Sequence, residues 1–288
     1  MKLTIGLANW DDPEGAWWTL SSLRLNHVPV TSKDVELLVV DDMPQPQVTL
    51  QKTCSLANAR YVHSGLGQGP ARAKDKVWEY AQGDYVLLLD SHVLLQPNVV
   101  GYLLNAIVAN TVGKNMWVGP LLNESGGMTA TELLPELRAH FFGVWHTNLD
   151  PAPVREIHAH GSAFCFMQRK HYPFFSPYFK GFAGEEIYLH DKVRRNGGRV
   201  LCHRALGWVH RFDRFGRNVT YALSLNDKMR NYMLAAYEMN WNIQQMREYF
   251  GKGLPEDQRL AVETALVQIY PDILTRDCSN IPKFKVHD

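Results

Sequence analysis

The chain has 288 residues, of which 45% are hydrophobic and 20% charged, and its formal net charge is +1. This composition is typical of a globular protein and gives no sign of disorder, and the near-neutral charge gives no general attraction to nucleic acid or to membrane surfaces. A chain of this length forms one large domain or two closely packed halves.

The cysteines and the apolar segments indicate the compartment. The cysteines are Cys54, Cys165, Cys202 and Cys278. Because they are widely spaced and none lies in a Cys-x-x-Cys pair, we interpret them as free thiols of a reducing compartment. No segment has the length that crossing a bilayer requires, and the apolar run at residues 3–8 is too short for a secretory signal. The sequence therefore predicts a cytoplasmic enzyme without membrane contact.

The first half alternates two kinds of hydrophobic pattern. Continuous apolar runs, which suit strands buried on both faces of a sheet, occupy residues 3–8, 35–40 and 85–89. Helical patterns occupy residues 16–25, 71–81 and 99–108. Pro70 stands where it suits the first position of the second helix. This alternation predicts an α/β fold with a mostly parallel sheet.

The rhythm breaks at Gly126-Gly127, which we interpret as a seam within one unit. Further strands are expected at residues 157–167, 199–203 and 206–212. Helices are expected at residues 184–196, where Gly197-Gly198 ends the pattern, and from residue 225 onward.

Acidic residues follow two of the predicted strands. Asp41 and Asp42 end the run at residues 35–40, and Asp90-Ser91-His92 ends the run at residues 85–89. Ligands of open α/β sheets bind beyond the carboxyl ends of the strands, and residues two apart in an extended segment point the same way. Asp90 and His92 can therefore bind one first-row divalent metal. The alternative is an aspartate that caps a turn beside a solvated histidine.

The ten residues that end in His92 resemble the metal motif of the polypeptide N-acetylgalactosaminyltransferases, in which Asp-x-His replaces the Asp-x-Asp of other family-2-like glycosyltransferases. Further resemblances to that family follow in the same order over residues 3–240. They are the acidic pair Asp41-Asp42, the segment Gly69–Lys74 for Gly-x-x-x-Ala-Arg, Gly184-Glu185-Glu186-Ile187 for its Gly-Gly-Glu motif, and Gly207–Phe212 for Gly-His-Val-Phe-Arg.

The resemblance implies a GT-A fold, that of the nucleotide-diphospho-sugar transferases, with a mostly parallel central sheet flanked by helices. A single catalytic domain would span residues 1–240, with a nucleotide-sugar-binding half at 1–125 and an acceptor-side half at 126–224. Residues 225–288 would form a C-terminal helical extension.

The resemblance also implies a ligand set. The metal, Mn²⁺ or alternatively Mg²⁺, would be bound by Asp90, His92 and His210, although His210 lies two positions later than the family's histidine. The nucleotide sugar would be bound by Asn9, Asp41, Asp42, Arg72, Ser91, Arg211 and Arg214. The plainer alternatives are a strand-terminal turn for Asp41 and Asp42, a solvated helix face for Arg72, an exposed basic loop for Arg211 and Arg214, and a strand-end histidine beside that loop for His210.

Glu185 and Glu186 are the predicted catalytic residues. Such a carboxylate takes the acceptor proton as general base in inverting enzymes, whereas in the retaining relatives it helps to hold the donor sugar. We favour retention, because the Asp-x-His match is the more specific one. The alternative is a pair of carboxylates placed at a helix start by the helix dipole. Residues 211–217, the basic segment, are predicted to close over the donor and exclude water.

The predicted function is a metal-dependent glycosyltransferase that moves a hexosyl or N-acetylhexosaminyl group from a UDP-sugar to a hydroxyl. The acceptor would be protein Ser/Thr or a hydroxymethylated DNA base, which would have to be flipped out of the duplex. Residues 191–230 contain ten lysines and arginines but three aspartates, which could bind DNA.

Two other functions remain open. A sugar-1-phosphate nucleotidyltransferase would need a Gly-rich basic loop after the first strand, which residues 5–11 do not provide. A sugar-nucleotide-binding module without turnover would not be expected to keep every site residue. The sequence does not indicate the oligomeric state.

Overall fold

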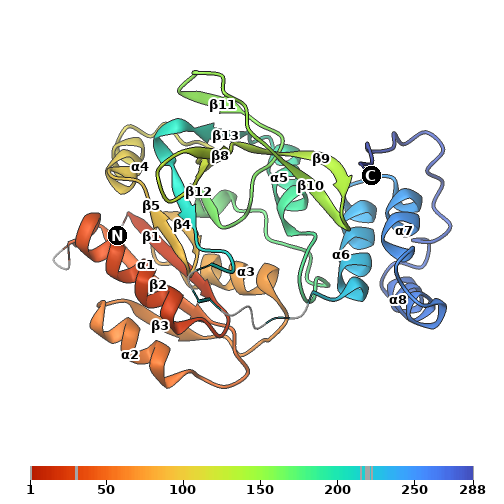
Figure 1. Ribbon diagram of the computed structural model, residues 1–288, viewed down its shortest axis with the longest axis horizontal. Helices are drawn as coiled ribbons and strands as arrows, with labels where there is room; N and C mark the ends of the chain where they lie inside the picture. Colours follow the sequence, from red (N-terminus) through yellow and green to blue (C-terminus); the bar gives the residue numbers. More distant parts are fainter. Residues whose placement is uncertain (1, 30–31, 215, 218–220, 222, 288) are drawn as a thin grey trace.

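The structure is a computed structural model that describes residues 2–29, 32–214, 216–217, 221 and 223–287 (Figure 1). Its central sheet has the order β11 (Val154–Glu156), β13 (Val200–His203), β6 (Met116–Val118), β12 (Phe164–Gln168), β4 (Tyr85–Asp90), β1 (Leu3–Asn9), β2 (Val35–Asp41) and β3 (Arg60–His63). The strands β4, β1, β2 and β3 run parallel, as do β6 and β13, whereas β12 and β11 are antiparallel to their neighbours. The predicted α/β class with a mostly parallel sheet is confirmed.

Helices cover both faces of this sheet. They are α1 (Pro13–Asn26), α2 (Val48–Leu56), α3 (Pro70–Tyr80), α4 (Val99–Val108), α5 (Glu185–Arg195), α6 (Leu225–Glu238), α7 (Ile243–Gly251) and α8 (Glu256–Ile269). Residues of α1, α2 and α4 share one buried cluster, and residues of α3, α5 and α6 share the other. The α3 helix approaches β1 so closely that a Cβ at Gly6 would lie 2.2 Å from Val77 Cγ1, so this strand position requires glycine.

Two smaller sheets complete the fold. One has the order β5 (Val93–Leu95), β14 (Trp208–His210), β7 (Leu121–Leu122) and β8 (Met128–Ala130), and the other is the hairpin β9 (Glu132–Arg138) and β10 (Phe141–His146). Pairing of Val93 with His210 brings β14 beside the chain that follows β4. This pairing brings residues that are 118 positions apart to one site.

The elements of the second half are shorter than expected. In place of a strand at residues 157–167, only Phe164–Gln168 pairs in the central sheet, and Ala159 forms an isolated bridge to Leu133. In place of a strand at 206–212, a 3-10 turn at Arg204–Leu206 precedes the three-residue β14. Helix α2 and the strands β3 and β5 to β11 were not predicted, because short or mixed hydrophobic patterns show little periodicity.

The C-terminal residues pack against the hairpin formed by β9 and β10. Helices α6, α7 and α8 lie together at the end of the molecule away from β3 (Figure 1). Leu137 of β9 bridges Val286, and Phe284 packs on Phe142 of β10 at a ring-centroid distance of 4.5 Å. The four cysteines are buried free thiols, as predicted. Among the described residues, no helix combines the length and the apolar character that crossing a bilayer requires.

Candidate active site

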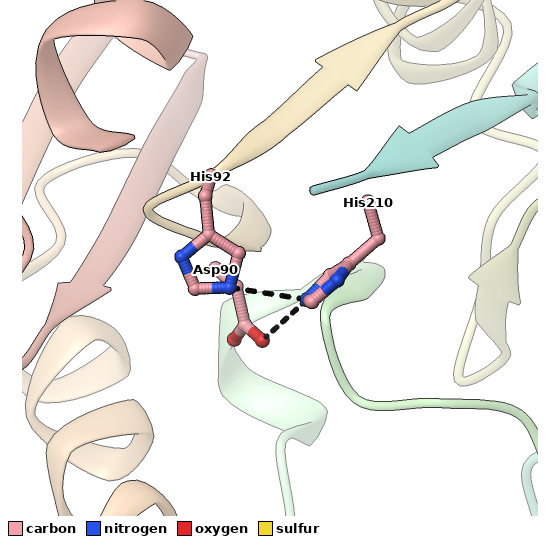
Figure 2. Close-up of side chains that lie close together, drawn as sticks. All are labelled: Asp90, His92 and His210. Carbon is pink, nitrogen blue, oxygen red and sulfur yellow. Dashed lines mark hydrogen bonds and ion pairs between the residues drawn. The ribbon is translucent and has the colours of Figure 1, made fainter. Parts of the chain in front are cut away.

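The three predicted metal ligands converge beyond the carboxyl end of β4. Asp90 ends β4, His92 follows two residues later, and His210 ends β14; their side chains point toward one another (Figure 2). The Nε2 atoms of the two histidines are 3.1 Å apart, and His210 Nε2 is 3.5 Å from Asp90 Oδ2. One ligand atom from each residue lies within 4.8 Å of the others. One carboxylate oxygen and two imidazole nitrogens at this spacing suit a divalent first-row metal.

The two histidines differ in whether the lone pair of Nε2 is available to a metal. Nδ1 of His92 donates to Asp12 Oδ2 at 2.8 Å, which leaves the Nε2 lone pair facing the other two ligands. Nδ1 of His210 instead accepts from the backbone N–H of Phe212 at 2.9 Å. Burial lowers the pKa of His210 and favours its neutral ring, whose proton then lies on Nε2. Metal binding by His210 therefore requires this proton to leave Nε2 and the bond with Phe212 to change.

Asp12 is a site residue that the sequence interpretation missed. It is the N-cap of α1, where its Oδ1 accepts from the N–H of Gly15 at 2.9 Å, and Arg217 Nε lies 3.1 Å from its Oδ2. Burial opposes ionisation, but the hydrogen bonds from His92 and Gly15 and the charge of Arg217 lower the pKa of Asp12 to about 2. The helix was predicted only from residue 16; an aspartate directly before Pro13 is the signal that could have indicated its earlier start and this cap.

Lys74 is a second residue that was missed as a site residue. It lies on α3 and is 4% exposed; its Nζ is 3.4 Å from Asp90 Oδ1 and donates to Ser162 Oγ at 2.6 Å. Burial opposes the charges of both partners, but their mutual attraction raises the pKa of Lys74 and holds the pKa of Asp90 well below its ordinary range. Lys74 therefore binds one oxygen of Asp90 and leaves the other toward the histidines.

The predicted catalytic pair begins α5, directly after Gly184, whose φ of 96° favours glycine. Glu185 is 1% exposed, and its Oε2 has no hydrogen-bond partner of normal geometry among the described residues. Burial raises the pKa of Glu185 and of Glu186, and the positive charge of Lys74 opposes this effect for both. The field of Lys74 thus links the start of α5 to the metal ligand Asp90.

Asn9 and Ser91, both predicted to contact the nucleotide sugar, bond to each other and to the chain. Asn9 Nδ2 donates to Ser91 Oγ at 3.0 Å and to the carbonyl of Asp12 at 2.7 Å. Ser91 Oγ donates to the carbonyl of Ala8 at 3.0 Å. These bonds fix the ends of β1 and β4 relative to the start of α1.

The adjacent Asp41 and Asp42 have different surroundings. Both oxygens of Asp41 accept hydrogen bonds, from the N–H groups of Met43 and Gln47 and from the hydroxyl of Tyr61 at 2.6 Å. Asp42 Oδ1 accepts from Ser64 Oγ at 2.6 Å, but the buried Oδ2 has no partner of normal geometry among the described residues. Burial raises the pKa of Asp42. Of the two, only Asp42 offers a free acceptor to a ligand.

The predicted arginines lie on two sides of the site. Arg72 Nη1 donates to Asp75 Oδ2 at 2.9 Å, within α3. Arg214 lies 2.5 Å from Glu124 and donates to the carbonyl of His210 at 2.8 Å, and Arg211 Nε donates to the carbonyl of Arg214 at 3.3 Å. The basic segment is thus folded on itself next to His210. Its residue Phe215 lies outside the described residues.

A cavity of about 820 Å³ is lined by residues of α1, α2, β5 and β14. Leu94 of β5 and Val209 of β14, which are paired in the sheet, line it, and strand alternation turns Val209 away from the side of His210. Trp17 of α1 and Arg211 form further walls. The cavity has the size of a small-molecule site, but the metal ligands converge elsewhere, and the two regions meet at the basic segment.

Comparison with solved structures gives the fold. The GalNAc-T7 structure with UDP, GalNAc and Mn²⁺ superposes with a TM-score of 0.67 at 14% identity, over 99% of this chain and 59% of that chain. The S. aureus TarS 1-349 structure superposes with a TM-score of 0.54 at 15% identity, over 96% and 76%. Its complex with UDP-GlcNAc gives 0.54 at 14% identity, over 94% and 75%. The chain therefore has the GT-A fold, and it spans about three fifths of the length of GalNAc-T7.

Sequence comparison gives the family. No curated protein matches the sequence. The model of glycosyl transferase family 2 matches residues 17–170, which is more than half of the chain and includes Asp90 and His92. Asp90 and His92 of the candidate metal cluster thus lie within the matched region, at the end of β4, whereas His210 lies beyond it. The chain belongs to glycosyl transferase family 2.

Proposed function

We propose that this glycosyltransferase uses a divalent metal, Mn²⁺ rather than Mg²⁺, to transfer a sugar from a UDP-sugar to a hydroxyl of a macromolecule. The convergence of Asp90, His92 and His210 carries the proposal. Two imidazoles favour Mn²⁺, because Mg²⁺ prefers oxygen ligands. A metal bound there would neutralise the charge that develops on the departing diphosphate.

Other residues of the chain would bind the nucleoside, orient Asp90 and exclude water. Asp42 Oδ2, for which the described residues supply no partner of normal geometry, would accept from the nucleoside. Lys74 would keep Asp90 ionised and oriented, with one oxygen toward the metal. The basic segment would cover the diphosphate with its arginines and exclude water. Asn9, Asp41 and Ser91 would hold these groups in place through the hydrogen bonds described above.

Glu185 would contact the donor sugar rather than serve as general base. A general base must be unprotonated, and burial, with the charge of Glu186, raises the pKa of Glu185. A protonated carboxyl donates a hydrogen bond, which suits the binding of a sugar hydroxyl. We therefore propose transfer with retention; proton NMR of the first product measures its anomeric configuration, and inversion would contradict this role of Glu185.

The acceptor is proposed to be a Ser/Thr hydroxyl of a polypeptide. The alternative, a hydroxymethylated DNA base, depended on the basic residues after Asp191, and the described contacts occupy several of them within the protein. Arg194 donates to the carbonyl of His158, and Arg199 bonds to Glu156 at 2.7 Å. Arg204 donates to the carbonyl of Asp150 at 2.9 Å.

A donor panel tests the function. Purified protein is incubated with UDP-sugars and other nucleotide sugars in Mn²⁺, Mg²⁺ or EDTA, while donor hydrolysis and Tm are followed. We expect one UDP-sugar to raise Tm and to be slowly hydrolysed in Mn²⁺ only, and incorporation of labelled sugar into peptides but not into hydroxymethylated DNA. Binding without hydrolysis or transfer would indicate a sugar-nucleotide-binding module. Pyrophosphorolysis of the donor would indicate a nucleotidyltransferase.

A cytoplasmic location is also proposed. The four cysteines are buried free thiols, which supports a reducing compartment.

A further inference from the structure

We propose that Asp12 is a positioning residue of the metal centre, which holds His92 in the form that binds a metal and ties the basic segment to the same centre through Arg217. The inference rests on the proposed metal-dependent function. Nothing in the Asp-x-His motif identifies Asp12, which lies 80 residues before His92.

The two carboxylate oxygens of Asp12 accept hydrogen bonds from different groups. Oδ1 caps α1 by accepting from the N–H of Gly15 at 2.9 Å. Oδ2 accepts from His92 Nδ1 at 2.8 Å and from Arg217 Nε at 3.1 Å. The backbone of Asp12 is held as well, since its carbonyl accepts from Asn9 Nδ2 at 2.7 Å. A carboxylate fixed at the cap and at the backbone has little freedom, so Oδ2 presents a defined acceptor.

This acceptor selects the tautomer of His92. The proton of the neutral ring lies on Nδ1, where Asp12 accepts it, and the lone pair of Nε2 faces His210 Nε2 and Asp90. A carboxylate behind a histidine ligand also raises the basicity of that ligand, and its loss typically costs 10–100-fold in metal affinity. Without Asp12, the ring can turn or carry its proton on Nε2, and both changes remove the metal-binding lone pair.

Asp12 Oδ2 is also connected to His210 by hydrogen bonds through the basic segment. Arg217 Nη1 donates to the carbonyl of Phe212 at 2.7 Å, and the N–H of Phe212 donates to His210 Nδ1 at 2.9 Å. Asp12 thus bonds to one histidine ligand directly and to the other through Arg217 and Phe212. Because metal binding must change the bond between Phe212 and His210, it acts on a segment that Asp12 anchors.

The substitution Asp12→Ser separates these roles from helix capping. Serine is as good an N-cap as aspartate, but its side chain is too short to reach His92 and carries no charge for Arg217. We expect D12S to keep the Tm of the wild type within a few degrees and to lose about 10–100-fold in Mn²⁺ affinity, measured by EPR of free Mn²⁺ without nucleotide. Asp12→Asn, which caps and keeps a neutral acceptor, should fall between the two.

Two further readouts are independent of metal. In metal-free protein labelled with ¹⁵N-histidine, the His92 resonances should report a proton on Nδ1 in the wild type and a shift toward Nε2 in D12S. Trypsin should cleave after Arg214 faster in D12S than in the wild type. The matched control Arg217→Met should also be cleaved faster, but it should retain the wild-type tautomer of His92.

Each outcome decides the inference. Wild-type Mn²⁺ affinity and an unchanged tautomer in D12S would overturn the role toward His92, and wild-type cleavage in D12S would overturn the anchoring of the segment. If the wild type itself bound no Mn²⁺, the proposed function would fail first, and the metal role of Asp12 with it. A loss of Mn²⁺ affinity in D12S with wild-type Tm supports both the proposed metal-dependent function and the role of Asp12 toward His92.

Discussion

The polar groups beyond β1, β2 and β4 are largely paired with one another, whereas those at the start of α5 are not. Asn9, Asp41 and Ser91 all make hydrogen bonds within the protein. On α5, Glu185 Oε2 and His190 Nε2 are buried without a partner of normal geometry among the described residues. The edge formed by the ends of β1, β2 and β4, which we propose binds the donor (the donor edge), is therefore largely fixed by hydrogen bonds within the protein, whereas α5 keeps two buried polar atoms without such a partner among the described residues.

The paired groups and the unpaired groups are expected to play different parts in ligand positioning and in catalysis. Paired groups at the donor edge hold the proposed metal and nucleotide ligands in place, and they contribute to stability. A buried carboxyl without a partner costs free energy in the folded protein, and such groups with shifted pKa values concentrate at functional sites. Lys74 stands between the two regions, bonded to Asp90 and Ser162 and attracted to Glu185.

The largest expected effect comes from breaking the donor edge at Asp90. Asp90→Asn should lower transfer by about 10³-fold, because the metal's contribution of several kcal/mol is lost. It should also lower Tm, since Lys74 is left buried with a weaker partner. Adding Lys74→Met should restore Tm but not transfer. A normal transfer rate in Asp90→Asn would remove this residue from the metal centre.

On the α5 side, Glu185→Gln should act in opposite directions on stability and on activity. Removal of a buried, unpaired charge should stabilise the fold by about 1–3 kcal/mol at alkaline pH, while transfer should fall by about 10²-fold. Glu186→Gln, at a more exposed position on the same helix turn, is the matched control and should stabilise less.

The pH dependence checks the same assignment. The pKa of Glu185 is raised above its ordinary 4.5, so the folded protein binds this proton more tightly than the unfolded chain. Its contribution to stability is then complete below about pH 4.5 and is lost as the pH rises through the folded-state value. Urea unfolding from pH 4 to 9 should show the wild type losing stability relative to Glu185→Gln as the pH increases. A constant difference would mean that the carboxyl is not perturbed.

Asp41 and Asp42 allow a smaller test at neighbouring positions. Asp41→Asn should destabilise by about 1–3 kcal/mol, because its amide would face groups that already donate to the carboxylate. Asp42→Asn should leave Tm nearly unchanged and raise the KM for the donor about tenfold, if Oδ2 accepts from the nucleoside. Calorimetric titration with UDP measures the second effect. Equal loss of UDP affinity in both variants would contradict the division between them.

Much of the N-terminal half was predictable because its signals are local. The runs that became β1, β2 and β4 are largely apolar, and β2 and β4 end in Asp, so both the parallel sheet and the pair Asp90 and His92 could be expected from the sequence. The contacts of Asp12 and Lys74 with this site were not found, because they join residues 80 and 16 positions apart, and the local signal at Asp12 indicates a helix cap and not a contact with His92.

The second half was harder for a physical reason. Its strands have two to seven residues, and several pair with partners far away in sequence, so their conformation depends on tertiary contacts. His210 was found despite a two-residue displacement, because an even shift preserves the face of a strand. The pairings of Arg194 and Arg199, which decide whether the basic region is free to bind DNA, could be seen only in three dimensions.

The smallest expected effect concerns the basic residues after Asp191, and it tests whether they too are paired within the protein. Arg199 and Glu156 form an exposed ion pair, and such pairs contribute about 0–1 kcal/mol, so Arg199→Gln should change Tm by less than about 2 °C. If the acceptor is a polypeptide, transfer and its dependence on salt should also stay unchanged. If this surface instead binds DNA phosphates, the substitution should weaken transfer to hydroxymethylated duplex and reduce the slope of log affinity against log salt by about one. Initial rates on both acceptors between 50 and 200 mM salt (roughly the range over which such contacts lose most of their affinity) therefore decide whether the arginines after α5 serve the fold or the substrate.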